Sequence, residues 1–103
     1  FTLLGFKSFR EKLVEYAYAA QKGKKNIYMN FAMSVTAGCD CEPRDMKPVV
    51  GDFGIFASTD PVAIDKACFD MSKVNGKKFR GEATFPYAEK IGLGSSEYTL
   101  VEL

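Results

Sequence analysis

The chain has 103 residues, of which 47% are hydrophobic and 26% charged, and its formal net charge at pH 7 is +1. This size and balance are those of one small globular domain, so we expect residues 1–103 to fold as a single unit with its own core. A nearly neutral chain creates no field that attracts a polyanion, and its two short basic runs stand beside glycines, as in solvated turns; the sequence therefore indicates no nucleic-acid partner. It also contains no apolar run of about eighteen residues, so we expect no membrane span and a soluble cytoplasmic protein.

The first predicted element is a helix that begins at Ser8. Ser8 and Glu11 have the spacing of a capping box, in which each side chain binds a free backbone amide of the other residue. Gly23 provides a C-terminal stop. Apolar side chains recur at helical spacing along one face, which we expect to pack on the rest of the domain. They are Phe9, Leu13, Tyr16, Ala17 and Ala20.

Residues 27–34 follow with the period of a β-strand. One face would carry Ile27, Met29, Phe31 and Met33. The other would carry Tyr28, Asn30, Ala32 and Ser34. Because both sets are largely apolar, we expect an interior strand that is covered on both faces. The strand leads into the loop with the Cys-Asp-Cys motif, at the carboxyl end where ligands collect in open α/β sheets.

A second strand is predicted at 53–57, after an irregular connection with two prolines. The turn that follows it points to a helix with Asp60 as N-cap and Pro61 at the first helical position, continuing to about residue 75. Its inward stripe is expected to comprise Ile64, Ala67, Cys68 and Met71.

A short helix at 86–90, ended by Gly92, and a last strand at 98–103 complete the predicted elements. Since strand–helix–strand connections cross over right-handedly, the second and third strands are predicted to be parallel. We therefore expect an α/β fold: a small sheet of about three strands, with at least one parallel pair, packed by two longer helices and one short helix.

The Cys39-Asp40-Cys41 motif is the first candidate site. Thiolates are soft ligands for zinc, copper(I) or iron in clusters, and a bridge between cysteines this close would be strained. The chain has no histidine, and its third cysteine, Cys68, falls on the buried stripe of the second predicted helix, so the chain does not complete a four-ligand site with soft donors. Two reduced loop cysteines without a metal remain the alternative.

Carboxylates around the second helix form the other candidate. Asp60 and Asp65, together with Ser58, Thr59 and Asp52, could line a cleft at the same edge as the cysteine motif and hold a cation or orient a substrate. In the structural alternative, Asp60 only caps the helix and Asp65 only faces its positive end. The lack of histidine excludes imidazole-based catalysis within this chain. No catalytic residue is assigned.

Three stretches of the sequence resemble a known family. They are "FREKLVEYAYAAQKGKKNIYMNFAMSVTAGCDCEP", "KPVVGDFGIFASTDPVAIDKACFDM" and "YAEKIGLGSSEYTLVEL". Together they resemble the C-terminal part of the iron–sulfur-associated family called domain of unknown function 362, from about Phe9 to Leu103. The resemblance implies a fragment of a longer iron–sulfur protein, whose relatives often carry a ferredoxin-like insert with two four-cysteine cluster motifs upstream. None of those cysteines is present here.

Two functions follow from this resemblance. In the first, the chain is a metal- or redox-linked domain in which Cys39 and Cys41 serve an iron–sulfur cluster or another metal ion that this chain alone does not complete, in electron transfer or a reductase-type reaction. In the second, it is a non-catalytic domain that packs against the ferredoxin-like region. The expected partner is that region or an electron-transfer protein, and the isolated chain is expected to self-associate through an apolar patch.

Overall fold

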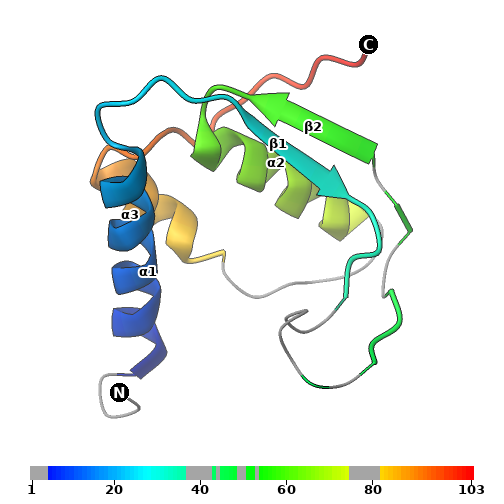
Figure 1. The fold of residues 1–103 in the computed structure, drawn as a ribbon, viewed down its shortest axis with the longest axis horizontal. Helices are drawn as coiled ribbons and strands as arrows, with labels where there is room; N and C mark the ends of the chain where they lie inside the picture. Colours follow the sequence, from blue (N-terminus) through cyan, green and yellow to red (C-terminus); the bar gives the residue numbers. More distant parts are fainter. Residues whose placement is uncertain (1–4, 37–42, 44, 49–50, 53, 75–81) are drawn as a thin grey trace.

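The computed structural model describes residues 5–36, 43, 45–48, 51–52, 54–74 and 82–103. Its elements follow the order α1 (Gly5–Gln21), β1 (Tyr28–Ala32), β2 (Gly54–Ser58), α2 (Pro61–Val74) and α3 (Thr84–Lys90) (Figure 1). The mixed α/β class is confirmed, and so are two longer helices and one short one. None of the helices in the described ranges is long and apolar enough to cross a membrane.

The sheet differs from the predicted one. Within the described residues it has two strands, β1 and β2, which pair antiparallel with Tyr28 opposite Ser58 and Ala32 opposite Gly54. Residues 98–103, all of them described, form no strand. The predicted third strand and the predicted parallel pair are therefore absent from this part of the chain.

The path of the chain after α2 explains why the crossover rule did not apply. The amide of Ser95 donates to Asp60 Oδ2 at 2.9 Å, and the hydroxyl of Tyr98 donates to Asp70 Oδ2 at 2.6 Å. The C-terminal segment therefore starts beside Asp60, the residue that precedes α2, and follows that helix in the helix's own direction, because α3 has already led the chain back (Figure 1). Since β2 runs opposite to α2 across the tight turn at Thr59, the segment lies antiparallel to β2.

The hydrogen bond to Asp70 also raises the pKa of the Tyr98 hydroxyl to about 12, so this phenol remains a hydrogen-bond donor at neutral pH.

The first helix packs through a different face from the predicted one. It starts at Gly5, three residues before Ser8, and among the described elements it packs mainly on α3. Val14 is buried in a small core with Val62 and Ala88. The hydroxyl of Tyr87 on α3 donates to Glu15 Oε2 at 2.9 Å. The predicted packing face points outward instead, and Leu13 and Tyr16 on it are 56% and 77% exposed.

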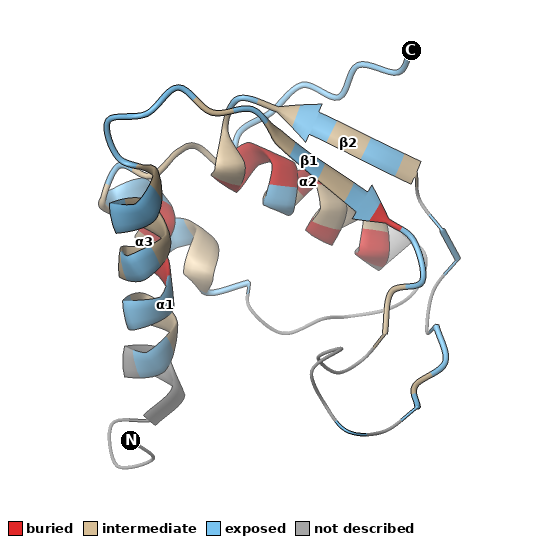
Figure 2. Ribbon diagram, viewed as in Figure 1, coloured by how far each residue is buried: buried red, intermediate tan, exposed pale blue. Residues whose placement is uncertain are grey.

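The second helix covers one face of the sheet. As predicted, Asp60 precedes it and Pro61 is its first residue. It packs on both strands and supplies most of the buried side chains, which are coloured red in Figure 2. They are Val62, Ala63, Ile64, Ala67, Phe69 and Ser72.

The other face of the sheet has no cover within the described residues. Met29, Phe31 and Ile55 on this face are each 58% exposed. The predicted covering of both faces is therefore not seen in the described part of the chain, where α2 is the one helix that packs on the strands.

Candidate functional site

Asp60 joins three segments at the end of the sheet where β2 stops. Its Oδ1 accepts hydrogen bonds from the amides of Val62 at 2.9 Å and Ala63 at 3.1 Å, which is the geometry of an N-cap. Its Oδ2 accepts from the amide of Ser95 at 2.9 Å, and its own amide donates to Ser58 Oγ at 3.0 Å. Both carboxylate oxygens are thus engaged in holding the β2–α2 turn and the C-terminal segment together.

Gly94 lies directly against this carboxylate. A Cβ atom built at Gly94 would stand 2.8 Å from Asp60 Cγ and 3.0 Å from Val62 Cγ2, so no side chain fits there without displacement. The motif Gly92-Leu93-Gly94-Ser95 therefore acts as a turn that docks on the start of α2.

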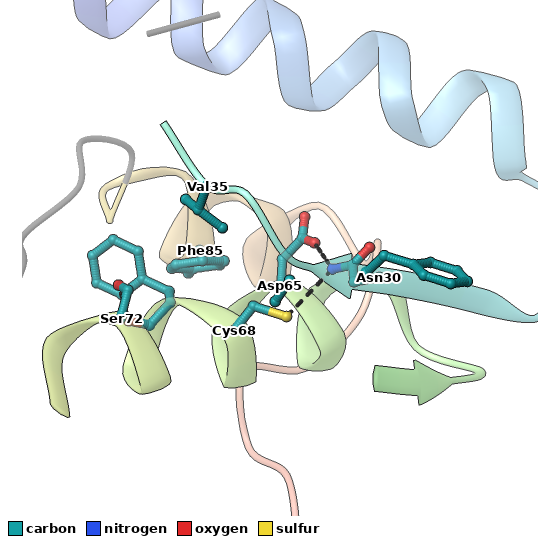
Figure 3. Close-up of a pocket in the computed structure, with 9 residues that line it drawn as sticks. Asn30, Val35, Asp65, Cys68, Ser72 and Phe85 are labelled. Carbon is teal, nitrogen blue, oxygen red and sulfur yellow. Dashed lines mark hydrogen bonds between the residues drawn. The ribbon is translucent and has the colours of Figure 1, made fainter. Parts of the chain in front are cut away.

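A cavity of about 390 Å³ lies between β1, α2 and α3 (Figure 3). Asn30 of β1 projects toward α2, and its Nδ2 donates to Asp65 Oδ1 at 3.0 Å and to Cys68 Sγ at 3.6 Å. Sequence reasoning missed Asn30, although an amide on the otherwise apolar inner face of a strand was a usable signal. The described residues that line it are Asn30, Phe31, Ala32, Val35, Asp65, Cys68, Phe69, Ser72 and Phe85.

The thiol of Cys68 is half-buried in this cavity wall. Burial raises its pKa, the hydrogen bond from Asn30 lowers it, and the nearby charge of Asp65 raises it further, with a net rise above the ordinary value. The thiol is therefore protonated at neutral pH, and in this form it is a weak nucleophile.

The structure separates the predicted cleft residues. Asp52 Oδ1 accepts from the amide of Ser34 at 2.9 Å, just after β1, where Ser34 has the left-handed φ of 54°. Because β1 and β2 are antiparallel, the end of β1 lies at the opposite end of the sheet from the turn that carries Ser58 and Asp60. The expectation that the Asp60 turn shares one edge with the loop after β1 is therefore overturned.

The remaining two candidates lie apart from each other as well. Asp65 lines the large cavity, whereas Thr59 lines a second cavity of about 220 Å³ with Tyr18 and Pro61 among its other walls. No single described cleft holds the five carboxylate and hydroxyl residues together.

Cys39, Asp40 and Cys41 lie outside the described residues. Within the described ranges, no group of three or more cysteine, aspartate and glutamate side chains is arranged to hold a metal ion. The role of the cysteine motif remains a prediction.

Fold and site together define a small mixed α/β domain with one covered sheet face and a carboxylate that fixes the strand–helix turn. The family model described as Domain of unknown function (DUF362) matches residues 3–70, well over half of the chain. The chain belongs to this family. No curated protein and no solved structure matches it.

Proposed function

We propose that the chain is a docking domain, which packs the open face of its sheet on another protein body. The resemblance stated above suggests that this body is the cluster-bearing, ferredoxin-like region of a longer iron–sulfur protein. The single observation that carries the proposal is the apolar character of that open face.

The open face is apolar at every paired position. Met29 stands opposite Ala57, and Phe31 stands opposite Ile55, so two cross-strand pairs form one patch. Ile27 continues the same alternation and is 77% exposed. A contiguous group of large exposed apolar side chains is typical of an interaction surface. Complete burial of each large side chain would contribute roughly 1.5–3 kcal/mol, so a partner has a substantial driving force to cover them.

Charges placed on this face are expected to abolish association. We expect the isolated chain to self-associate at high concentration in sedimentation experiments and the pair Phe31→Lys/Ile55→Lys to stay monomeric. Leu13→Lys is the matched control, since Leu13 is 56% exposed but lies on α1. In the longer protein, the double variant Phe31→Lys/Ile55→Lys should let this domain come apart from the ferredoxin-like region once limited proteolysis has cut the chain between them.

Two results would contradict the docking proposal. One is a wild-type chain that remains monomeric at the highest concentration reached. The other is a Leu13→Lys variant that loses association while the sheet variant retains it, which would move the interface to α1.

A second candidate function rests on the cysteine motif. We propose that Cys39 and Cys41 are thiolate ligands or redox thiols for an iron–sulfur cluster or another metal ion, with Asp40 beside them and the remaining ligands supplied from outside this chain. The support is chemical: two soft donors stand two positions apart in the connection after β1. Electron transfer or a reductase-type reaction would be the resulting role.

Metal analysis and visible absorption of the longer protein after anaerobic purification test this assignment. We expect Cys39→Ser/Cys41→Ser to lose metal and to lose or shift the visible absorption, whereas Cys68→Ser serves as the single-thiol control and changes neither. Unchanged metal content and an unchanged spectrum in the double variant would remove the ligand assignment.

A further inference from the structure

The cavity between β1, α2 and α3 is a hollow that is wide open to solvent and is lined mostly by apolar side chains. Its volume of about 390 Å³ falls within the range of roughly 300–1,000 Å³ typical of ligand pockets. Phe69 and Phe85 meet edge to face, with ring centroids 5.6 Å apart and an angle of 73° between the ring planes. Val35, which is labelled in Figure 3, and Ala32 also line the cavity with apolar side chains. An apolar body would therefore be desolvated on one side of the cavity.

The polar side of the cavity carries one negative charge. Among the described residues that line it, Asp65 is the only charged one. Within the described part of the chain, its carboxylate accepts a hydrogen bond from neutral Asn30, and neither described ion pair includes it. The neighbouring cation, Lys66, is instead paired with Asp70 at 2.5 Å. Its Nζ also lies 5.9 Å from the ring centroids of both Phe69 and Phe85, although Lys66 itself is not among the described residues that line the cavity. A ligand that enters the cavity therefore meets an anion that forms no ion pair with any cation in the described part of the chain.

Asn30 holds this polar side in place. Its amide bridges Asp65 Oδ1 and Cys68 Sγ, which fixes the carboxylate next to a neutral thiol (Figure 3). An anionic ligand would be repelled by Asp65, whereas an ammonium group could form a charge-assisted hydrogen bond with it.

We propose that this cavity binds a small arylalkylamine, with the ammonium group at Asp65 and the aromatic ring against Phe69 and Phe85. The inference goes beyond the docking function, because Asn30 and Ala32 line the site from the face of β1 that meets α2. Of the open-face residues named above, Phe31 alone also belongs to the described lining. It assigns a ligand class to a cavity that neither proposed function uses.

Three probes of similar shape test the proposal on the 103-residue chain by calorimetric or ligand-detected NMR titration. Phenethylamine carries a positive charge, phenethyl alcohol is neutral and hydrocinnamate is negative. We expect the amine to bind about three- to tenfold more tightly than the alcohol, because its ammonium group would form one partly exposed charge pair with Asp65. We expect hydrocinnamate to give no saturable binding, because Asp65 repels its carboxylate.

The variant Asp65→Asn should remove the preference for the amine and leave the affinity for the alcohol unchanged. Glu97→Gln is the matched control, because it makes the same chemical change at an exposed residue outside the cavity, and it should keep the preference. Phe85→Ala should weaken both amine and alcohol, with the dispersion of the amide spectrum showing that the fold persists. Equal affinities for the three probes, a preference that survives Asp65→Asn, or no saturable binding of the amine would overturn the proposal.

Discussion

Asp60→Ala is expected to lower the free energy of unfolding by about 2–4 kcal/mol, a large effect for a single substitution. The carboxylate accepts three backbone hydrogen bonds, from Val62, Ala63 and Ser95. Loss of an N-cap alone costs about 0.5–2 kcal/mol. The unpaired amide of Ser95 adds a further penalty, because its hydrogen bond to a charged acceptor is lost.

Urea denaturation followed by circular dichroism measures this effect. Asp60→Asn should lose less, since its one remaining amide oxygen can still cap α2 but cannot also accept from Ser95 as the second carboxylate oxygen does. Asp65→Ala is the control. It removes an exposed carboxylate on the same helix, and the one described partner of this carboxylate is the side-chain amide of Asn30. It should lower the free energy of unfolding by less than about 1 kcal/mol. Equal losses of stability for Asp60→Ala and Asp65→Ala would show that Asp60 does not join the β2–α2 turn to the C-terminal segment.

The start of α2 could be predicted from sequence because its determinants are local. An aspartate followed by proline, at the end of a short strand, satisfies the free amides within three residues of the chain. The bond from Ser95 to the same carboxylate could not be predicted, because it joins residues 35 positions apart and depends on where α3 returns the chain.

The face by which α1 packs was beyond sequence reasoning for a similar reason. Apolar residues occur on more than one side of this helix, with Val14 on one and Leu13 and Tyr16 on another. The apolar periodicity of α1 is compatible with burial of more than one of its faces. Which face is buried depends on the position of α3, which lies much later in the chain. The Phe9 and Tyr16 side remains a surface that a partner could cover.

The alternation in residues 27–34 identified β1 and both of its faces, but not the neighbour or the direction of pairing. An antiparallel partner places the ends of β1 and β2 at opposite ends of the sheet, and this separates Asp52 from Asp60. The contact of Asn30 with Asp65 and Cys68 likewise needs the position of β1 on α2, across 35 and 38 residues. The arrangement of the candidate site depends on strand pairing and helix packing between residues that are far apart in the sequence. The kinds of residue in the site could therefore be predicted, but not which of them lie close together.

Gly94→Ala is expected to lower the free energy of unfolding by about 1–3 kcal/mol, as overpacking in a tight contact does. The added methyl group would overlap the Asp60 carboxylate and press on Val62, so either the turn or the cap must shift. The cause is steric, since Gly94 is not among the described glycines with positive φ. Urea denaturation measures the loss, and Gly51→Ala is the matched control, because a Cβ there meets nothing within 4 Å. That control should range from neutral to about 1 kcal/mol more stable.

The double variant Asp60→Ala/Gly94→Ala separates this contact from a general weakness of the C-terminal turn. If the methyl group that Gly94→Ala adds destabilises the fold by colliding with the Asp60 carboxylate, removal of that carboxylate relieves the collision, and the double variant should be more stable than the sum of the single losses predicts by about 1 kcal/mol. Strict additivity would mean that the two residues act independently. The loss caused by Gly94→Ala would then come from contact with Val62, the other side chain that a Cβ at Gly94 meets. The connection between the start of α2 and the C-terminal segment would rest on the hydrogen bond from the amide of Ser95 alone.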